Sequence, residues 1–352
     1  MTRPRPPATA QDAAQTAPDT APDTVAAVGE FGVIDRVLAR SGSARLADLG
    51  PGDDAAVVRA PDGRVVACTD VLVEGRHFRR DWSSATDVGH KAAAANLADI
   101  AAMGAVPTAL LVGLACPAGT PAGWLEDVAT GMAAECAPFG AAVVGGDTVS
   151  SAPDSTAVVL SVTALGDLGG RAPVTRSGAR PGDVVAVAGR LGWSACGWAV
   201  LRRGSTSPQA VVSAHRRPAP PYAAGPAAAD AGVTAMCDVS DGLLADAGHL
   251  ATASDVRLEL DRALLSAAFV DPAGPLVGVA AALGGDPMAW VLTGGEDHAL
   301  LATFPPDAEL PAAFVAVGGV TAGPPGVLVG GIAAELVAEG LGAEGTGHVH
   351  FR

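Results

Sequence analysis

Apolar residues recur along this chain with two different spacings, and segments with the two spacings alternate. Helical spacing predicts helices over residues 30–38, 86–103 and 124–136, whereas short apolar runs predict strands over 65–68, 141–144 and 156–165. Such alternation is typical of α/β layers, in which helices cover a sheet. The first half of the chain is therefore expected to form an α/β unit.

A segment rich in glycine, proline and arginine, residues 166–182, separates these elements from a second group. The second group begins with a predicted strand over 184–188 and a helix from about Ser194. Residues 204–230 are rich in proline and alanine and predict a loop with a short helix. The segment 166–182 is thus the expected crossing between two domains.

The length of 352 residues allows two hydrophobic cores. We expect an N-terminal domain over 29–168 and a C-terminal domain over 169–352. Residues 1–28 are rich in proline, alanine, threonine and aspartate and lack the apolar core of a secretory signal. They predict a disordered tail.

The formal net charge of −15 opposes binding to bare nucleic acid, because affinity for the phosphate backbone depends on clustered lysine and arginine. The only lysine, Lys91, lies outside any G-x-x-x-x-G-K-[ST] pattern. A Walker A loop and a conventional protein-kinase site are therefore excluded. The charge of a phosphate ligand has to be neutralised in another way, for which a metal ion is the natural candidate.

Hydropathy and cysteine usage indicate the compartment. No run of 18 or more apolar residues is present, so we expect no membrane span. The five cysteines are scattered, without C-x-x-C spacing, which favours a reduced cytoplasmic protein. They are Cys68, Cys116, Cys136, Cys196 and Cys237.

Aspartates recur in five short segments that a fold can bring together. The segments are Gly52-Asp53-Asp54, Thr69-Asp70, Asn96-Leu97-Ala98-Asp99, Gly145-Gly146-Asp147-Thr148 and Asp238-Val239-Ser240-Asp241-Gly242. Three of them follow predicted strands, and ligands of α/β sheets bind at the carboxyl ends of strands. Mg²⁺ prefers oxygen ligands and is usually shared between carboxylates and substrate phosphates. The pattern predicts a metal-nucleotide site, although each aspartate taken alone is as well explained as a turn former or a helix cap.

Other segments offer groups for anionic or cationic ligands. Arg171 and Arg176 lie in the crossing segment, where a guanidinium group can clamp a phosphate. His77, in a loop, is a candidate contact for an anionic substrate, and Glu296, after Gly294-Gly295, is one for a cationic group. The alternative for Arg171 and Arg176 is an ordinary surface arginine, and the alternative for His77 is a structural histidine.

Together these segments resemble thiamine-monophosphate kinase, of the superfamily that includes aminoimidazole ribonucleotide synthetase. The resemblance runs from Gly29-Glu30-Phe31 to His350-Phe351 and covers nearly everything beyond the tail. Besides the aspartate segments, it rests on Glu74-Gly75-Arg76-His77-Phe78, Thr175-Arg176-Ser177-Gly178-Ala179 and Gly294-Gly295-Glu296-Asp297. Cys68 and His348 depart from the family pattern, which has Ser or Thr and an aromatic residue there.

The resemblance implies transfer of the ATP γ-phosphoryl group to thiamine monophosphate with several Mg²⁺ ions, on two α/β domains whose N-terminal domains form a homodimer. It implies these metal ligands: Asp54, Thr69, Asp70, Asp99, Asp147, Asp238 and Asp241. Gly146, Asp147, Arg176 and Ser240 are implied ATP contacts, and His77 and Glu296 implied substrate contacts. Asp99, Asp147 and Asp241 are the expected catalytic residues.

Two rivals stay open at this point. One is another enzyme of the superfamily, such as a selenophosphate synthetase or a hydrogenase-maturation protein, which needs a functional cysteine near one end of the chain. The other is a non-catalytic regulator that binds nucleotide or thiamine without turnover. The regulator would bind Mg-ATP without consuming it, whereas the enzyme would consume it.

Overall fold

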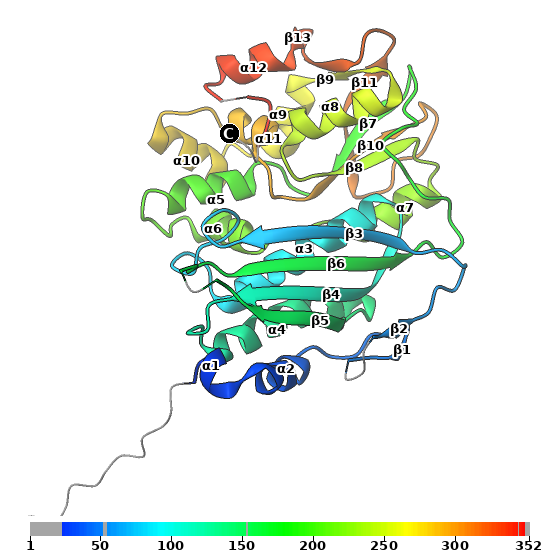
Figure 1. Cartoon of the computed structure of the whole chain (residues 1–352). Helices are drawn as coiled ribbons and strands as arrows, with labels where there is room; N and C mark the ends of the chain where they lie inside the picture. The colour runs from blue at the N-terminus through cyan, green and yellow to red at the C-terminus, as the bar shows by residue number, and fades with distance from the viewer. Residues whose placement is uncertain (1–22, 52–54, 153, 344, 349–352) are drawn as a thin grey trace, which may run out of the picture.

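The computed structural model describes residues 23–51, 55–152, 154–343 and 345–348. Two α/β units, each built on its own sheet, lie one above the other in Figure 1. The expected α/β architecture with two domains is confirmed. No single described helix is long and apolar enough to cross a membrane. One pair of described helices, α10 (Pro275–Leu283) and α11 (Pro287–Thr293), meets the criterion together by length and composition, but the pair is bent by 112°.

The N-terminal unit contains four helices, a 3₁₀ turn and six strands among the described residues. In chain order they are α1 (Val25–Val28), α2 (Glu30–Leu38), β1 (Ala47–Leu49), β2 (Val57–Val58), β3 (Val66–Val73), α3 (Ala85–Ala102), β4 (Val106–Cys116), α4 (Ala122–Cys136), η1 (Ala137–Phe139), β5 (Val143–Ser150) and β6 (Val159–Asp167). Four strands form a sheet of order β3-β6-β4-β5, in which only β4 and β5 are parallel.

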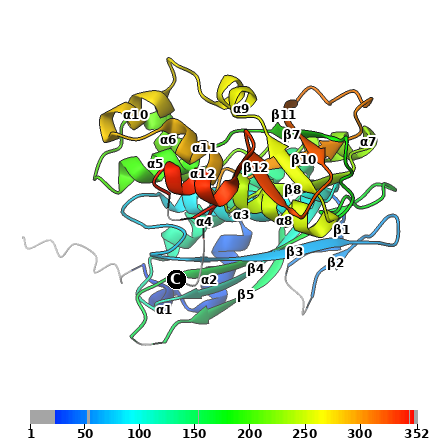
Figure 2. The ribbon, with the colours of Figure 1, turned by 90° about the horizontal axis from the view of Figure 1, so that it is seen from above.

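Helices α3 and α4 cover one face of this sheet, and the opposite face is open in Figures 1 and 2. Side chains alternate between the two faces along each strand. Leu72 and Leu160 therefore point into the core beneath the helices, whereas Val71, on the open face, is 49% exposed. Leu111 and Val149 extend the apolar part of the open face, at 36% and 49% exposure.

Helix α3 begins at a capping box, in which Ser84 and Asp87 exchange backbone and side-chain hydrogen bonds. It crosses α4 at close range because each helix has a glycine that faces the backbone of the other helix. A Cβ at Gly89 would lie 1.9 Å from the Val128 carbonyl oxygen, and one at Gly131 would lie 2.1 Å from that of Thr86. The two helices can pack at this distance only without side chains there.

The C-terminal unit begins with β7 and is built on a seven-stranded sheet of order β13-β12-β9-β11-β7-β10-β8. Its elements are β7 (Val184–Ala188), α5 (Trp193–Leu201), α6 (Gln209–Arg216), α7 (Ala224–Asp230), β8 (Ala235–Val239), α8 (Leu243–Ser254), β9 (Arg257–Leu260), α9 (Arg262–Phe269), α10 (Pro275–Leu283), α11 (Pro287–Thr293), β10 (Ala299–Phe304), β11 (Phe314–Thr321), β12 (Gly326–Val329), β13 (Ile332–Ala333) and α12 (Ala334–Gly340).

Helix α3 also packs against the C-terminal unit. Its last residue, Ala102, belongs to a buried cluster with Ala228 of α7 and Met236 of β8. Gly225 of α7 approaches so closely that a Cβ there would lie 2.0 Å from the Ala101 carbonyl oxygen. The helix is therefore shared by both domains.

Several expected elements differ from those observed. Residues 25–28 of the predicted tail form α1, which Thr24 caps; residues 1–22 lie outside the described part. The strands predicted to stop at Cys68 and Val144 continue to Val73 and Ser150, because the two-residue alternation of faces runs on through the polar residues. Residues 204–230 hold two helices, not one.

The α3–α4 crossing makes a testable prediction. Gly131→Ala places a methyl group where the Thr86 carbonyl oxygen lies, so the helices must separate. We expect a loss of about 1–3 kcal/mol in the free energy of unfolding, measured by urea denaturation.

Gly278→Ala, in the exposed part of α10, is the matched control, since nothing lies within 4 Å of the added methyl. It is expected to stabilise by about 0.5–1 kcal/mol. Equal effects of the two substitutions would show that the α3–α4 distance is not set by glycine.

Candidate active site

Strand β3 and helix α3 build the first part of the site at the edge of the N-terminal sheet. Asn96 is fully buried; its Oδ1 accepts the Asp70 backbone N–H at 3.1 Å, and its amide donates to the Ala92 carbonyl oxygen at 3.0 Å. Asp99, one turn later, lies on the same side of α3. The Cys68 thiol donates to the Asn96 carbonyl oxygen at 3.3 Å. Asn96 thus fixes the edge of β3 beside the Asp99 carboxylate.

Strand β8 brings a third carboxylate to this place from the other domain. Burial, followed by the charges of Asp238 and Asp70, raises the pKa of Asp99 to about 7. Asp238 is itself buried and lies 3.0 Å from Nδ1 of His298, measured from its Oδ2. Burial opposes charge on His298, but the bond to Asp238 raises the pKa of its imidazole above the ordinary value. Asp70, Asp99 and Asp238 therefore form one acidic cluster between the domains.

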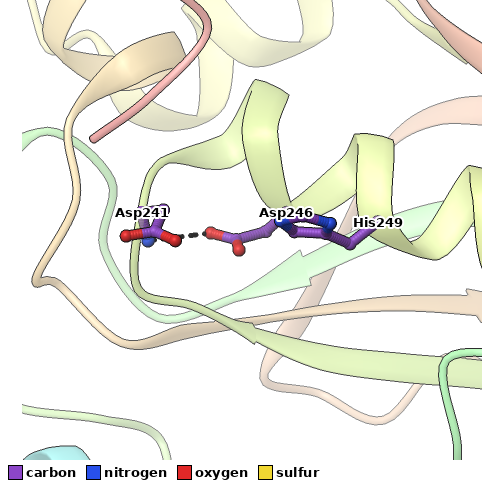
Figure 3. Close-up of side chains that lie close together, drawn as sticks. All are labelled: Asp241, Asp246 and His249. Carbon is purple, nitrogen blue, oxygen red and sulfur yellow. Dashed lines mark hydrogen bonds between the residues drawn. The ribbon is translucent and has the colours of Figure 1, made fainter. Parts of the chain in front are cut away.

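A second acidic group follows directly at the start of α8 (Figure 3). Carboxylate oxygens of Asp241 and Asp246 and a ring nitrogen of His249 lie within 4.8 Å of one another. Asp246 accepts the backbone N–H groups of Asp241 and Gly242, each at 3.1 Å. Burial, then the charges of Asp238 and Asp241, raises the pKa of Asp246 to about 7. Asp246 links this group electrostatically to the interdomain cluster.

A tight turn after α11 makes close backbone contacts with the Asp241 loop. The Glu296 N–H donates to the Ser240 carbonyl oxygen at 2.8 Å, and a Cβ at Gly295 would lie 2.2 Å from that oxygen. From the C-terminal segment, the His348 N–H donates to the Asp241 carbonyl oxygen at 2.9 Å. Three segments distant in sequence thus meet at residues 240 and 241.

The side chain of Glu296, which belongs to this turn, lies beside a lysine and a histidine. Its Oε2 lies 3.0 Å from Nζ of Lys91 and 3.5 Å from Nδ1 of His215. Lys91 also donates to the His77 carbonyl oxygen at 3.0 Å. Both residues expected to contact substrate, His77 and Glu296, are therefore tied to the same ammonium group.

Two expected metal ligands point away from the cluster. The register of the N-terminal sheet places Asp147 in one row with Gly113, Ser161 and Val71, on the open face. Thr69 faces the same way, because its hydroxyl accepts a hydrogen bond from the Thr163 hydroxyl at 3.0 Å. The side chains of Thr69 and Asp147 therefore lie on the face of the sheet opposite to that of Asp70.

The expectation that Asp70, Asp147 and Asp238 follow the ends of strands is wrong. Asp70, Asp147 and Asp238 lie inside β3, β5 and β8. At Gly146, the glycine is required by the neighbouring strand, since a Cβ would lie 2.0 Å from the carbonyl oxygen of Val112. Asp241 lies just before α8, as predicted.

The remaining predicted residues have simpler places. Arg176 is exposed in the crossing segment, where its carbonyl oxygen accepts the Ser254 hydroxyl at 2.7 Å. Arg171 is paired with Asp230 at 2.7 Å, so its guanidinium is committed to another contact. Ser240 lies in the turn before α8. Asp54 lies outside the described residues.

The sequence reading missed Lys91, His215, Asp246, His249 and His298. Asp246 and His249 stand at the third and sixth positions after Leu243, on the helix that follows Asp241, and that spacing was an available signal. The other three approach the site only through tertiary contacts.

The donor set fits Mg²⁺. Five carboxylates lie across the domain boundary, and burial with mutual repulsion raises the pKa of two of them. Hard oxygen ligands with accumulated negative charge suit Mg²⁺ shared with phosphates. The residues that would hold it are Asp70, Asp99, Asp238, Asp241 and Asp246.

Comparisons with known proteins agree with this architecture. Models of the AIR synthase related proteins match the chain, the N-terminal domain over residues 52–168 and the C-terminal domain over 180–331. These matches define the class of protein to which the two sheets and the acidic cluster belong.

Individual relatives are more specific. The thiamine-monophosphate kinase of Mycobacterium tuberculosis is 51% identical over 304 residues, which cover 86% of this chain and 88% of that protein. That of Corynebacterium glutamicum is 41% identical over 302 residues, 84% of this chain and 86% of that protein. A solved structure of AaThiL complexed with AMPPCP and TMP has a TM-score of 0.72 at 31% identity and covers 92% of this chain and 98% of that one. The chain belongs to the thiamine-monophosphate kinase family.

The raised pKa of Asp99 makes a prediction about stability without metal. A carboxyl whose folded pKa exceeds its unfolded value costs stability as pH rises from about 4 through about 7. In EDTA at pH 8, Asp99→Asn should therefore be more stable than the unchanged protein by on the order of 1 kcal/mol, with the difference vanishing near pH 4. Urea denaturation at both pH values measures this.

Adding Mg²⁺ at pH 8 should reverse the order, because binding stabilises the protein that retains the ligand. A stability difference independent of pH and of Mg²⁺ would mean that Asp99 lies in neither an acidic cluster nor a metal site.

Proposed function

We propose that this protein transfers the γ-phosphoryl group of ATP to thiamine monophosphate, forming thiamine diphosphate and ADP, with several Mg²⁺ ions. The observation that carries the proposal is the acidic cluster of Asp70, Asp99 and Asp238 between the domains, in a chain 51% identical to a thiamine-monophosphate kinase. The complex of AaThiL with AMPPCP and TMP supports ATP as donor and thiamine monophosphate as acceptor. Five free cysteines support a cytoplasmic location.

The acceptor is a phosphate oxygen that is already anionic near neutral pH, so no side chain has to remove a proton from it. The residues instead orient the reactants, which favours direct in-line transfer. Magnesium held by Asp99, Asp238 and Asp241 would supply charge neutralisation to the two phosphate groups. Arg176 is placed in the crossing segment, and we assign its guanidinium to an ATP phosphate.

The experiment that tests this proposal is ³¹P NMR of the purified protein with ATP, thiamine monophosphate and Mg²⁺. Thiamine diphosphate and ADP should appear together, and only with metal. In a parallel reaction with γ-³²P-ATP, the denatured protein should carry no label, since in-line transfer leaves no phosphoenzyme.

Asp241→Asn should lower turnover on the order of a hundredfold in the same assay, by weakening a metal clamp. Bound but unconsumed ATP would identify a regulator, ADP with free phosphate a different acceptor, and labelled protein a covalent intermediate.

We also propose that the protein is a homodimer formed through the open face of the N-terminal sheet. Val71, Leu111 and Val149 expose apolar surface there, and Asp147 points to the same side. A second copy on this face would cover the apolar side chains and give Asp147 a role that one chain does not provide. Contiguous exposed apolar residues mark interaction surfaces in soluble proteins.

Val71→Asp should convert the dimer into a monomer, because a charge in a buried apolar contact weakens association by about a hundredfold or more. Sedimentation velocity measures the mass. Val315→Asp is the matched control, on a strand of the other sheet at 44% exposure, and should leave the dimer intact. If the protein without substitutions sediments as a monomer, the homodimer is contradicted.

A further inference from the structure

Lys91 is the only lysine of the chain and is almost completely buried, with 5% exposure. It lies in the first half of α3, where an alanine-rich helix would bury an apolar residue at less cost. Its ammonium lies 3.0 Å from two oxygens, the His77 carbonyl and Oε2 of Glu296. One oxygen comes from each domain. The ammonium therefore joins the two segments expected to contact the acceptor.

The Glu296 carboxylate is held on one side only. Its ion pair with Lys91 and its contact with His215 both use Oε2. In the part of the chain that the structure describes, Oε1 accepts no hydrogen bond, and the side chain is 35% exposed. The backbone adds a constraint, because Glu296 has a φ of 64°, a conformation that bulky residues rarely adopt.

Charge around this carboxylate is nearly balanced. Burial opposes ionisation, but the charge of Lys91 lowers the pKa of Glu296 to about 2, so it is an anion at neutral pH. Burial, followed by the charge of Lys91, lowers the pKa of His215 to about 3, so that imidazole is neutral. His298 also acts on Glu296. Lys91 and Glu296 together thus carry no net charge.

We propose that Lys91 is a positioning residue of the acceptor subsite: it holds Oε2 of Glu296 and the His77 carbonyl, and leaves Oε1 to accept a hydrogen bond from an amino group on the acceptor's heterocycle. The inference rests on the proposed function and deepens it. A carboxylate already paired with an ammonium is a weak countercharge for a cationic ring but a good hydrogen-bond acceptor. The expectation that Glu296 serves a cationic group is accordingly replaced by recognition of an uncharged N–H donor.

An interdomain ion pair with no part in recognition is the competing explanation. Helix α3 offers a matched control for it, because Asp87 pairs with Arg217 of the C-terminal unit. That ion pair also joins the two domains, but it contacts neither His77 nor Glu296 among the described residues. Arg217→Gln therefore removes an interdomain ion pair while leaving the subsite unchanged.

The experiment measures kcat and KM for both substrates in Lys91→Met, Lys91→Arg, Glu296→Gln and the double variant Lys91→Met/Glu296→Gln. Lys91→Met should raise KM for thiamine monophosphate by about tenfold or more, with KM for ATP and kcat changed less than about twofold. Lys91→Arg should restore part of the loss. Arg217→Gln should leave both KM values unchanged.

The double variant separates positioning from simple packing. If Lys91 acts through Glu296, then Lys91→Met should add less than about twofold to KM in the Glu296→Gln background. Multiplicative effects, or equal rises of both KM values, would overturn the inference. If a thermal scan shows that Lys91→Met does not fold, the test uses Glu296→Gln and Lys91→Arg instead. A KM for thiamine monophosphate that is unchanged in both variants would overturn the inference.

Failure of this inference is distinguishable from failure of the proposed function. If the protein without substitutions forms no thiamine diphosphate, the kinase assignment itself is refuted. An active protein in which Lys91→Met leaves the acceptor KM unaltered refutes only the role of Lys91.

Discussion

Helix α3 has almost no surface left for water, because the four-stranded sheet, α4 and the C-terminal unit each occupy part of it. Its alanines and Gly89 keep the helix narrow enough for three neighbours to approach. Polar side chains on such a helix are costly unless each finds a partner. Lys91 and Asp99 find theirs at the boundary between the domains, where Lys91 pairs with Glu296 and the charge of Asp238 acts on Asp99, so the packing of one helix also locates the site.

The charges at this boundary are separated into two regions. Toward β8 and α8, carboxylates accumulate beside the imidazoles of His249 and His298, and their repulsion favours a bound cation. Toward the Glu296 turn, Lys91 balances the Glu296 carboxylate. A metal-bound phosphate suits the first region, and a nearly neutral organic group suits the second. This division matches a substrate with a phosphate at one end and a heterocycle at the other.

Much of the fold could be predicted because its signals are local. The bounds predicted for α2 agree with the structure, and those for α3 differ by one residue, since both helices have apolar spacing and clear ends. The pattern predicts strands that end too early, at Cys68 and Val144, because polar residues on alternate positions resemble turn residues. Periodicity does not reveal that one of those polar positions faces an open surface and the other faces an adjacent domain.

The segments that form the site could be predicted from the sequence, but the directions in which their side chains point could not. Thr69 and Asp70 are neighbours in sequence, yet strand alternation sends their side chains to opposite faces of the sheet. A single chain can therefore use only one of the two side chains at the acidic cluster. The other, together with Asp147, faces the surface through which we expect a second copy to bind. If both sets of residues serve phosphoryl transfer, the sheet is at once a wall of the site and the dimer interface, and loss of the dimer should then impair catalysis as well as association.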